Sequence, residues 1–225
     1  MPDLPSRQRH EDEMVVALML IFSQWENRVT TGGVDWDRFG GEVSVAVEPP
    51  LREAHQHAAE QVAKIAGHTV PPGDVSREAA EWADRASREV GASMAATSRD
   101  RAAEAESQSL DAMSPAAAFT TLMAAQFART RAVNVSMTEI TRAVSAGETS
   151  FLVRFDLETS STTKSFWITE LDARVCPICS PLHNVSETVY GREFPSGPPA
   201  HPRCRCFLEH RAEPAFGPGD IVILA

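Results

Sequence analysis

All four cysteines of this 225-residue chain lie in its last quarter, and three of them belong to two short turns of matching design. The first turn is "CPIC", from Cys176 to Cys179, and the second is "HPRC", from His201 to Cys204. Each turn reads ligand, proline, spacer, ligand, and 21 residues separate the two. Zinc prefers thiolate and imidazole ligands in a tetrahedron, and a proline restricts the turn that carries them. This spacing, typical of zinc ribbons, therefore predicts a structural metal site.

The fourth cysteine, Cys206, leaves the choice of ligands open. It follows Cys204 by two residues, so on a strand both thiols would face the same way, and Cys206 could replace Cys204 or His201. His183 and His210 are weaker candidates, which we interpret as surface histidines. Two disulfides or a redox-active CxxC turn are the alternatives, although no βαβ pattern surrounds the turn. The predicted zinc ligands are drawn from Cys176, Cys179, His201, Cys204 and Cys206.

A metal held by four side chains has no open coordination position for water, which argues against catalysis at this centre. The sequence also contains no recognisable nucleophile–base pair, so we expect no enzymatic activity. Asp172 lies four residues before the first turn. It could accept hydrogen bonds from the amides of that turn or pair with Arg174, and either contact would orient the metal ligands.

The segments that must position this cluster are mostly helical. Residues 11–29 carry large apolar side chains on one helix face. These are Met14, Leu18, Ile21, Phe22, Trp25 and Val29. Further helices are expected over residues 51–65, over 75–110 and from 115 to near Gly147, which should end the last one. Residues 34–48 are ambiguous, and Pro49-Pro50 should stop any helix there.

The composition changes after residue 148. Phe151, Val153 and Phe155 alternate with other residues, as in a half-buried strand, and "KSFWI" at 164–168 predicts a second strand. The Ser/Thr cluster at 159–163 should form the turn between them. We therefore expect an α+β, mostly α, fold. It would consist of a helical body over residues 1–148 and a small β-rich, zinc-stapled module over residues 149–225.

The charge and the apolar runs restrict the partners. The formal net charge is −10, so the chain has no overall attraction to DNA or to an anionic membrane. A local basic spot at Arg203, Arg205 and Arg211 is the candidate for DNA contact. The longest apolar run, Met14–Phe22, has nine residues, whereas a membrane-spanning helix needs about 20. Acidic residues at 11–13 precede it, which makes a secretory signal unexpected, and a reducing cytoplasm would disfavour disulfides.

Two separated motifs, "KSFWITELDARVCPICSPLHN" and "PPAHPRCRC", resemble the Mu F-like (MuF) family of phage minor head, or head morphogenesis, proteins. The positions that fit are Trp167, Thr169, Asp172, Arg174, Val175, Cys176, Cys179, Pro198, Pro199, His201, Pro202, Cys204, Arg205 and Cys206. The resemblance covers roughly residues 115–210, and residues 1–114 match no family that we recognise.

The resemblance implies a component of a tailed phage or prophage, assembled in the bacterial cytoplasm and located in the virion, inside the capsid at the portal vertex. The partners that we expect are the portal protein, the major capsid protein and, locally, packaged DNA, with no membrane and no small-molecule substrate. We expect the helices to contact the portal, because their apolar stripes over residues 11–29 and 51–145 exceed what a body of this size should bury. Two alternatives stay open: an HNH-type nuclease with a zinc site, and a generic zinc-ribbon adaptor.

Overall fold

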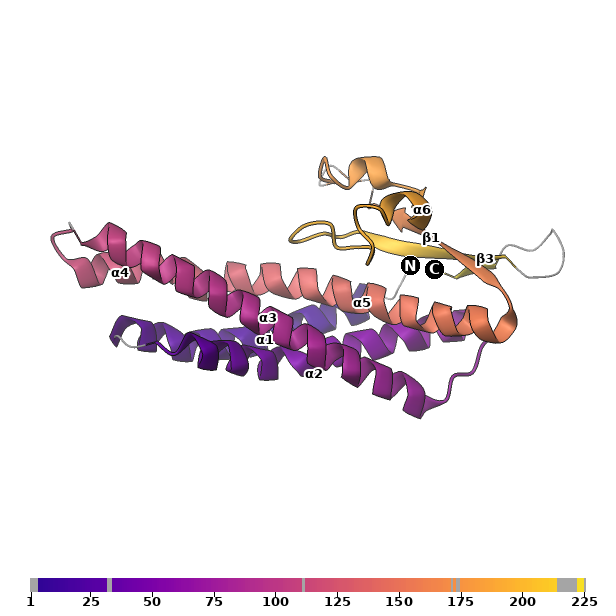
Figure 1. Ribbon diagram of the computed structural model, residues 1–225, viewed down its shortest axis with the longest axis horizontal. Helices are drawn as coiled ribbons and strands as arrows, with labels where there is room; N and C mark the ends of the chain where they lie inside the picture. The colour runs from indigo at the N-terminus through magenta and orange to yellow at the C-terminus, as the bar shows by residue number, and fades with distance from the viewer. Residues whose placement is uncertain are drawn as a thin grey trace.

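Long helices form an elongated body, and a small sheet lies against one of its sides (Figure 1). The computed structural model describes residues 4–31, 34–110, 112–170, 172, 175–213 and 222–224. The long helices are α1 (Leu4–Thr31), α2 (Trp36–Ile65), α3 (Pro72–Ser109) and α5 (Arg129–Thr159). The short helix α4 (Pro115–Met123) and the 3-10 turn η1 (Ala124–Phe127) connect α3 to α5, so the single helix expected from residue 115 is divided in two. The other three expected helices are confirmed.

The described part of the sheet is antiparallel throughout and has the strand order β2-β1-β3-β4. Its strands are β1 (Thr162–Ile168), β2 (Val185–Ser186), β3 (Phe207–Glu213) and β4 (Val222–Leu224). A 3-10 turn, η2 (Ser180–Leu182), and a one-turn helix, α6 (Glu187–Tyr190), lie between β1 and β3 in the chain. The predicted strand over "KSFWI" is confirmed as part of β1. The mostly helical α+β fold class is confirmed as well.

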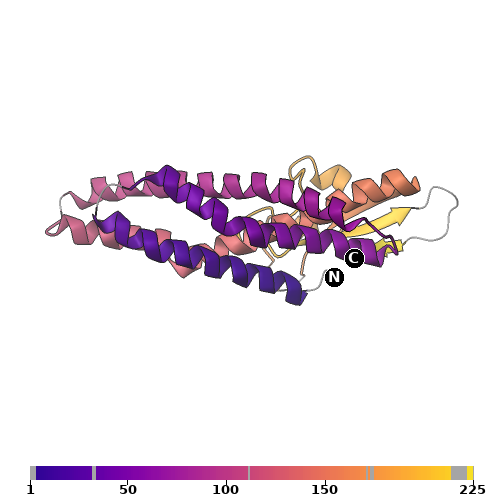
Figure 2. The same ribbon diagram turned by 90° about the horizontal axis from the view of Figure 1, so that it is seen from below.

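The predicted apolar face of α1 forms the centre of the helical body. Met14, Leu18 and Phe22 are fully buried, and they pack with residues of α2, α3 and α5 in one continuous cluster. The expectation that the stripes exceed what the body can bury is therefore wrong for most of their length. Among the large apolar residues left exposed are Val16 and Leu20 of α1 and Val45 of α2. Figure 2 shows that α1 and α2 form much of the body's face away from the sheet.

Helix α2 runs through Pro49 and Pro50, where the sequence predicted a stop. Each proline removes one backbone donor, and an interior proline costs a helix about 3 kcal/mol. The apolar stripe explains the continuation. Val43, Val47 and Leu51 are spaced four residues apart on both sides of the prolines, and all three are fully buried. Burial of this continuous face offsets the lost hydrogen bonds.

Helix α5 continues past Gly147 to Thr159, so Gly147 does not end it. A Cβ atom at Gly147 would lie 2.1 Å from the backbone oxygen of His55 on α2. The glycine therefore permits the close approach of two helices. A similar approach joins α2 to α3, where a Cβ atom at Gly91 would lie 2.2 Å from the Gly40 oxygen.

The strand predicted around Phe151, Val153 and Phe155 is wrong, because these residues belong to α5. Phe151 and Phe155 are four residues apart, and both rings contact the ring of His68, at centroid distances of 6.0 and 5.6 Å. Val153 is exposed. The alternation over three residues was therefore a short sample of helical periodicity. The expected boundary at residue 149 falls inside α5, and the chain leaves this helix at Ser160, whose φ is 54°.

The sheet contacts α5 through side chains: His210 of β3 lies 3.4 Å from Glu148, and Thr163 of β1 donates to Asp156. Trp167 of β1 is fully buried in a small core with Tyr190, Leu208 and the cysteines, and the rings of Tyr190 and Phe194 lie 5.5 Å from its ring.

None of the helices in the described residues is long and apolar enough to cross a membrane.

Candidate metal centre

The two ligand turns are shaped by local backbone hydrogen bonds. In the first turn, the amide of Ser180 donates to the Cys176 oxygen at 3.0 Å, and the amide of Cys179 donates to the Cys176 sulfur at 3.3 Å. In the second turn, the amide of Cys204 donates to the His201 oxygen at 3.2 Å. The amides of Cys179 and Ser180 therefore hold Cys176 in place at the start of the first turn.

The five predicted ligand residues come together although 21 residues separate the turns. His201 Nε2 lies 2.9 Å from Cys176 Sγ and 3.2 Å from Cys179 Sγ. Cys179 Sγ lies 3.8 Å from Cys204 Sγ. All four cysteines are free thiols, so the disulfide alternative has no support in the structure.

The cluster consists of two overlapping triads. Within each triad the ligand atoms lie within 4.8 Å of one another. One contains Cys176, Cys179 and His201, and the other contains Cys179, Cys204 and Cys206. A cavity of about 30 Å³ lies beside four of the five residues. Cys179 belongs to both triads and lines this cavity. The cluster can therefore hold a metal ion, and Cys179 is the candidate ligand that the two triads share.

His201 is held in the tautomer that a metal requires. Its Nδ1 lies 2.8 Å from the backbone oxygen of Pro202, to which it donates its proton. The lone pair is therefore on Nε2, the atom that faces Cys176 and Cys179. A backbone acceptor for the second ring nitrogen is the usual support of a histidine ligand.

Crowding makes the thiols unequal. The pKa of Cys204 is lowered to about 5, chiefly because the Cys206 thiol donates a hydrogen bond to it. The pKa of Cys179 is raised to about 12, chiefly by burial and then by the charge of Cys204. The pKa of Cys206 is raised, chiefly because its proton is held by Cys204. Several thiolates can therefore coexist here only beside a cation.

A buried indole supports the fit of a metal to these residues. The Trp167 Nε1–H is buried without a hydrogen-bond partner in the described part of the chain. The indole lies close enough to Cys206 to favour the thiolate form, against the larger effects that raise the pKa of Cys206. A thiolate at Cys206, as metal ligation requires, would give this indole an acceptor. Cys204 and Cys206 precede β3 and so do not lie on a strand, but both are buried and their sulfurs lie within 4.8 Å of each other.

Asp172 clamps the two halves of the centre together. Its two carboxylate oxygens accept hydrogen bonds from Arg205 at 2.9 and 2.7 Å. Arg205 lies between Cys204 and Cys206, so the pair joins the segment before the first turn to the residue that follows the second turn. Such support orients the ligands without touching the metal. Of the two expected roles for Asp172, pairing with Arg174 concerns a residue outside the described part of the chain.

The two weaker histidine candidates lie outside the cluster. His183 Nδ1 lies 3.2 Å from the Thr169 amide, which donates to it. His210 is almost fully buried and contacts Ser165 and Glu148, so its interpretation as a surface histidine is wrong. The sequence held one signal for this burial: Cys204, Cys206, Leu208 and His210 alternate, as on a strand with one buried face.

The metal centre is tied to the helical body through backbone groups of its second turn. The Cys204 oxygen accepts hydrogen bonds from Thr141 Oγ1 at 3.2 Å and from an Arg7 nitrogen at 3.4 Å. The amide of Arg203 donates to Thr138 Oγ1 at 3.1 Å. Helices α1 and α5 therefore both contact the turn that carries two of the candidate ligands.

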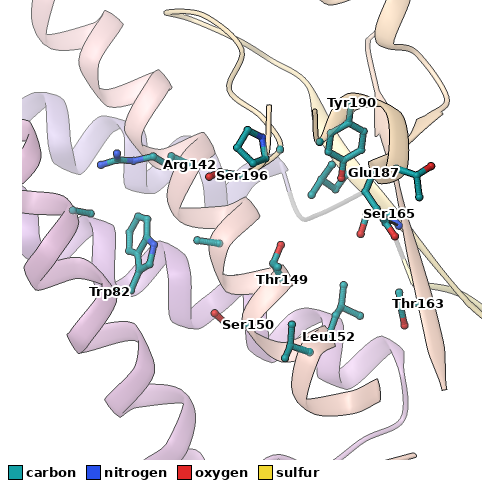
Figure 3. Close-up of a pocket in the computed structure, with 18 of the residues that line it drawn as sticks. Trp82, Arg142, Thr149, Ser150, Leu152, Thr163, Ser165, Glu187, Tyr190 and Ser196 are labelled. Atoms are coloured by element: carbon teal, nitrogen blue, oxygen red, sulfur yellow. Dashed lines mark hydrogen bonds between the residues drawn. The ribbon is translucent and has the colours of Figure 1, made fainter. Parts of the chain in front are cut away.

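A cleft of about 910 Å³ separates the module from the helices beside this joint. Figure 3 shows its two walls: Trp82 and Arg142 lie on helices at one end, and Ser165, Glu187 and Tyr190 lie on the module. No residue of the metal cluster lines it. The sequence contained no signal for this cleft, because its walls come from segments far apart in the chain.

Comparisons of the chain with protein-family models, with curated proteins and with solved structures gave no match. The five candidate ligand residues are therefore supported by their distances in this structure. The resemblance to phage head proteins remains an expectation from the two sequence motifs.

Proposed function

We propose that this chain is a minor head, or head morphogenesis, protein of the Mu F-like type. In this proposal it is a structural component of the virion, bound at the portal vertex inside the capsid after assembly in the bacterial cytoplasm. The metal centre fixes the shape of a small module that the helical body carries. It serves assembly and not metal-dependent catalysis.

One observation supports this proposal above others: residues of the two family-like motifs interact with each other or with the module core. Trp167 fills the core, and Thr169 contacts His183. Asp172 of the first motif pairs with Arg205 of the second. The residues that the two motifs share with the family therefore contact one another or the core of the module. Proteins that share this fold would need the same contacts.

Zinc is the metal that we propose for the centre. Thiolates and imidazole are its preferred ligands, and four of them complete a tetrahedron without water. A zinc ion would supply charge that lets several crowded thiolates ionise together, and it would add folding free energy to a module with a small core. Cys179, present in both triads, is the ligand that every four-residue combination should include.

The proposed contact surface for the portal protein is the exposed apolar group Val16, Leu20 and Val45, which we call the α1–α2 patch. Their exposed fractions are 60%, 60% and 76%. Val16 and Leu20 lie one helical turn apart on α1, Val45 lies on the neighbouring helix α2, and exposed apolar groups on packed helices are typical of protein interfaces. The acidic balance of the chain favours a protein surface over DNA. A contact with the major capsid protein is a further part of the proposal.

Local DNA contact has less support within this proposal. Arg205 is paired with Asp172, and Arg211 is paired with Glu209 and stacks on the Phe166 ring at 4.0 Å. Their charges are therefore partly neutralised. Of the three arginines in the expected basic spot, Arg203 would carry most of any contact with phosphate.

Co-expression with the portal protein of the same phage, followed by size-exclusion chromatography, tests the proposal. The wild-type chain should elute with the portal, and a Val16→Ser, Leu20→Ser, Val45→Ser variant should elute alone. Leu157→Ser is the control, because Leu157 is 80% exposed but lies on α5. If the triple variant binds the portal as wild type does, the α1–α2 patch is not the interface. If the wild type never binds, the portal assignment itself is wrong.

A further inference from the structure

Three polar residues from three elements form a hydrogen-bonded chain at the joint between the module and α5. Ser165 Oγ of β1 lies 2.9 Å from His210 Nδ1 of β3, and His210 Nε2 lies 3.4 Å from Glu148 Oε2 of α5. His210 and Glu148 are almost fully buried, whereas the half-buried Ser165 lines the 910 Å³ cleft. The His210–Glu148 end of this hydrogen-bonded network is therefore closed to water. At its other end, Ser165 faces a space large enough for a small molecule.

The network determines which ring nitrogen of His210 carries the proton. Glu148 can only accept when ionised, so we assign the proton to Nε2 and the lone pair to Nδ1. Nδ1 then accepts the hydrogen bond from the Ser165 hydroxyl. A hydroxyl that donates to a base, which is itself oriented by a carboxylate, is the arrangement of an activated serine nucleophile.

A further donor lies beside Ser165. Tyr190 is buried next to the serine, and burial, followed by the charge of Glu187, raises the pKa of its hydroxyl to about 12. The phenol therefore remains protonated at neutral pH and can donate a hydrogen bond. The Ser165 amide is already bonded to the Glu187 carboxylate, so it cannot serve this purpose. Figure 3 shows Tyr190, Glu187 and Ser165 together on the module wall.

We propose that Ser165 is the nucleophile of an ester-hydrolysing site at the cleft. His210 acts as its general base, Glu148 is a positioning residue that orients His210, and the Tyr190 hydroxyl stabilises the negative oxygen of the tetrahedral intermediate. This activity goes beyond the proposed assembly role and departs from the expectation that the chain is no enzyme. The sequence could not reveal the site, because residues 148, 165 and 210 share no local motif.

The reaction balances with water as the co-reactant. Ser165 Oγ attacks the ester carbonyl carbon while its proton passes to His210 Nδ1. The carbon–oxygen bond to the alcohol breaks, and the alcohol leaves with the proton from His210. Water then gives a proton to the same nitrogen and attacks the acyl carbon. The bond from this carbon to Ser165 Oγ breaks, the carboxylic acid leaves, and His210 returns the proton to Ser165 Oγ.

The lining of the cleft favours an ester that carries a negative group. Its acidic residues are engaged within the protein: Glu89 pairs with Arg142, and Asp156 accepts from Thr163. Glu187, described above, holds the Ser165 amide. The guanidinium groups of two lining arginines, Arg85 and Arg192, have no ion pair or hydrogen bond with the side chains and backbone of the described residues. Free guanidinium groups beside apolar lining residues suit a carboxylate on an aliphatic acyl chain.

Two assays with full-length protein test the nucleophile. The first is covalent labelling by a fluorophosphonate probe, which reacts with activated serines. The second is hydrolysis of 4-nitrophenyl acetate and of the mono-4-nitrophenyl ester of glutaric acid. We expect labelling at Ser165 and turnover that falls at least about 100-fold in Ser165→Ala. Absence of labelling at Ser165, or equal turnover in Ser165→Ala, overturns the proposal.

A purely structural role for the same network makes different predictions. Glu148→Gln keeps the shape of the side chain, so a structural contact would be largely preserved. As a positioning residue, Glu148 should instead affect kcat: the variant should lose kcat by about tenfold or more with little change in KM, while its circular dichroism spectrum stays that of the wild type. Unchanged kcat in a folded Glu148→Gln variant would assign the network to docking alone.

The preference for an anionic ester has its own matched pair of variants. Arg192→Gln should raise KM for the glutarate ester about fivefold more than it raises KM for the acetate ester. Arg129→Gln is the control, since Arg129 is likewise without an ion pair in the described residues but does not line the cleft. An equal effect of Arg192→Gln on both esters would contradict the charge preference.

Discussion

Cys179 illustrates what could be predicted at the scale of residues. Ligand types and spacing were enough to name the five residues that converge, because a metal site imposes strict chemistry on nearby positions. The same reasoning could not choose four ligands from five, since that choice depends on Å-scale distances. Nor could it find Glu148 and Ser165, whose partner His210 lies far away in the chain.

The first prediction at this scale concerns the shared ligand. Cys179→Ser should bind less than about 0.3 zinc per chain, because it removes the sulfur common to both triads. His183→Ala should bind as much zinc as the wild type, since His183 contacts Thr169 instead of the cluster. Elemental analysis of both purified variants measures this. Loss of zinc from His183→Ala would show that the centre has been assigned wrongly.

In both variants and the wild type, we expect no metal-dependent cleavage of plasmid DNA.

A second prediction at this scale concerns His55 of α2. The side chain is buried, neither ring nitrogen has a partner among the described residues, and the Trp82 ring lies 5.2 Å away. Burial, assisted by Arg85, lowers its pKa from 6.5 to about 4. Below pH 6.5, His55 is protonated in the unfolded chain but stays neutral in the folded protein. The free energy of unfolding therefore falls as the pH drops towards 4.

Between pH 7 and pH 5, His55 should lower the free energy of unfolding by about 2 kcal/mol. Urea unfolding of the wild type and of His55→Leu at both pH values isolates the effect, since both proteins share every other titrating group. The wild type should lose about 2 kcal/mol more than the variant. Parallel pH dependence in the two proteins would contradict a neutral, buried His55.

At the scale of elements, amphipathic periodicity predicted the helices well where the pattern was long. Residues 11–29 are an example, with a face that is buried as expected. The errors came from local signals overruled by packing. Pro49 and Pro50 lie inside α2 because the buried stripe continues across them, and three alternating residues around Phe151 were too few to separate a strand from a helix.

The third prediction concerns the crossing of α2 and α3. An alanine Cβ at position 91 would lie 2.2 Å from both the Gly40 oxygen and Ser44 Oγ, so Gly91→Ala should force the helices apart and cost about 1–3 kcal/mol. Gly41→Ala is the control on α2, where a Cβ meets no atom within 4 Å. It should stabilise the protein by about 0.5–1 kcal/mol. Thermal unfolding compares the two. A neutral Gly91→Ala would be inconsistent with this close approach.

At the scale of the whole molecule, the metal module and the helical body are one connected structure. Arg7 of α1 and Thr141 of α5 both bind the Cys204 oxygen, and Glu148 contacts His210. Removing residues 1–110 would expose the buried face of α5, so such a truncation cannot test the portal interface cleanly. Surface variants of the α1–α2 patch avoid this difficulty.

The fourth prediction follows from this connection. Chelation of the metal should remove hydrogen-exchange protection from β1 and β3, because metal binding supplies folding free energy to a small core. Helix α2 should keep its protection, since its main contacts are with α1, α3 and α5. Exchange measured by mass spectrometry separates these segments. Full protection of β1 and β3 after chelation would mean that the module folds without metal.

The most direct test of the central claim is the zinc content of the wild-type protein, purified under reducing conditions and measured by elemental analysis. A structural centre built from Cys176, Cys179, His201, Cys204 and Cys206 predicts about one zinc per chain, with the cysteines inaccessible to thiol reagents until a chelator is added. Less than about 0.3 zinc per chain, with the cysteines paired as disulfides or freely reactive, would contradict the account.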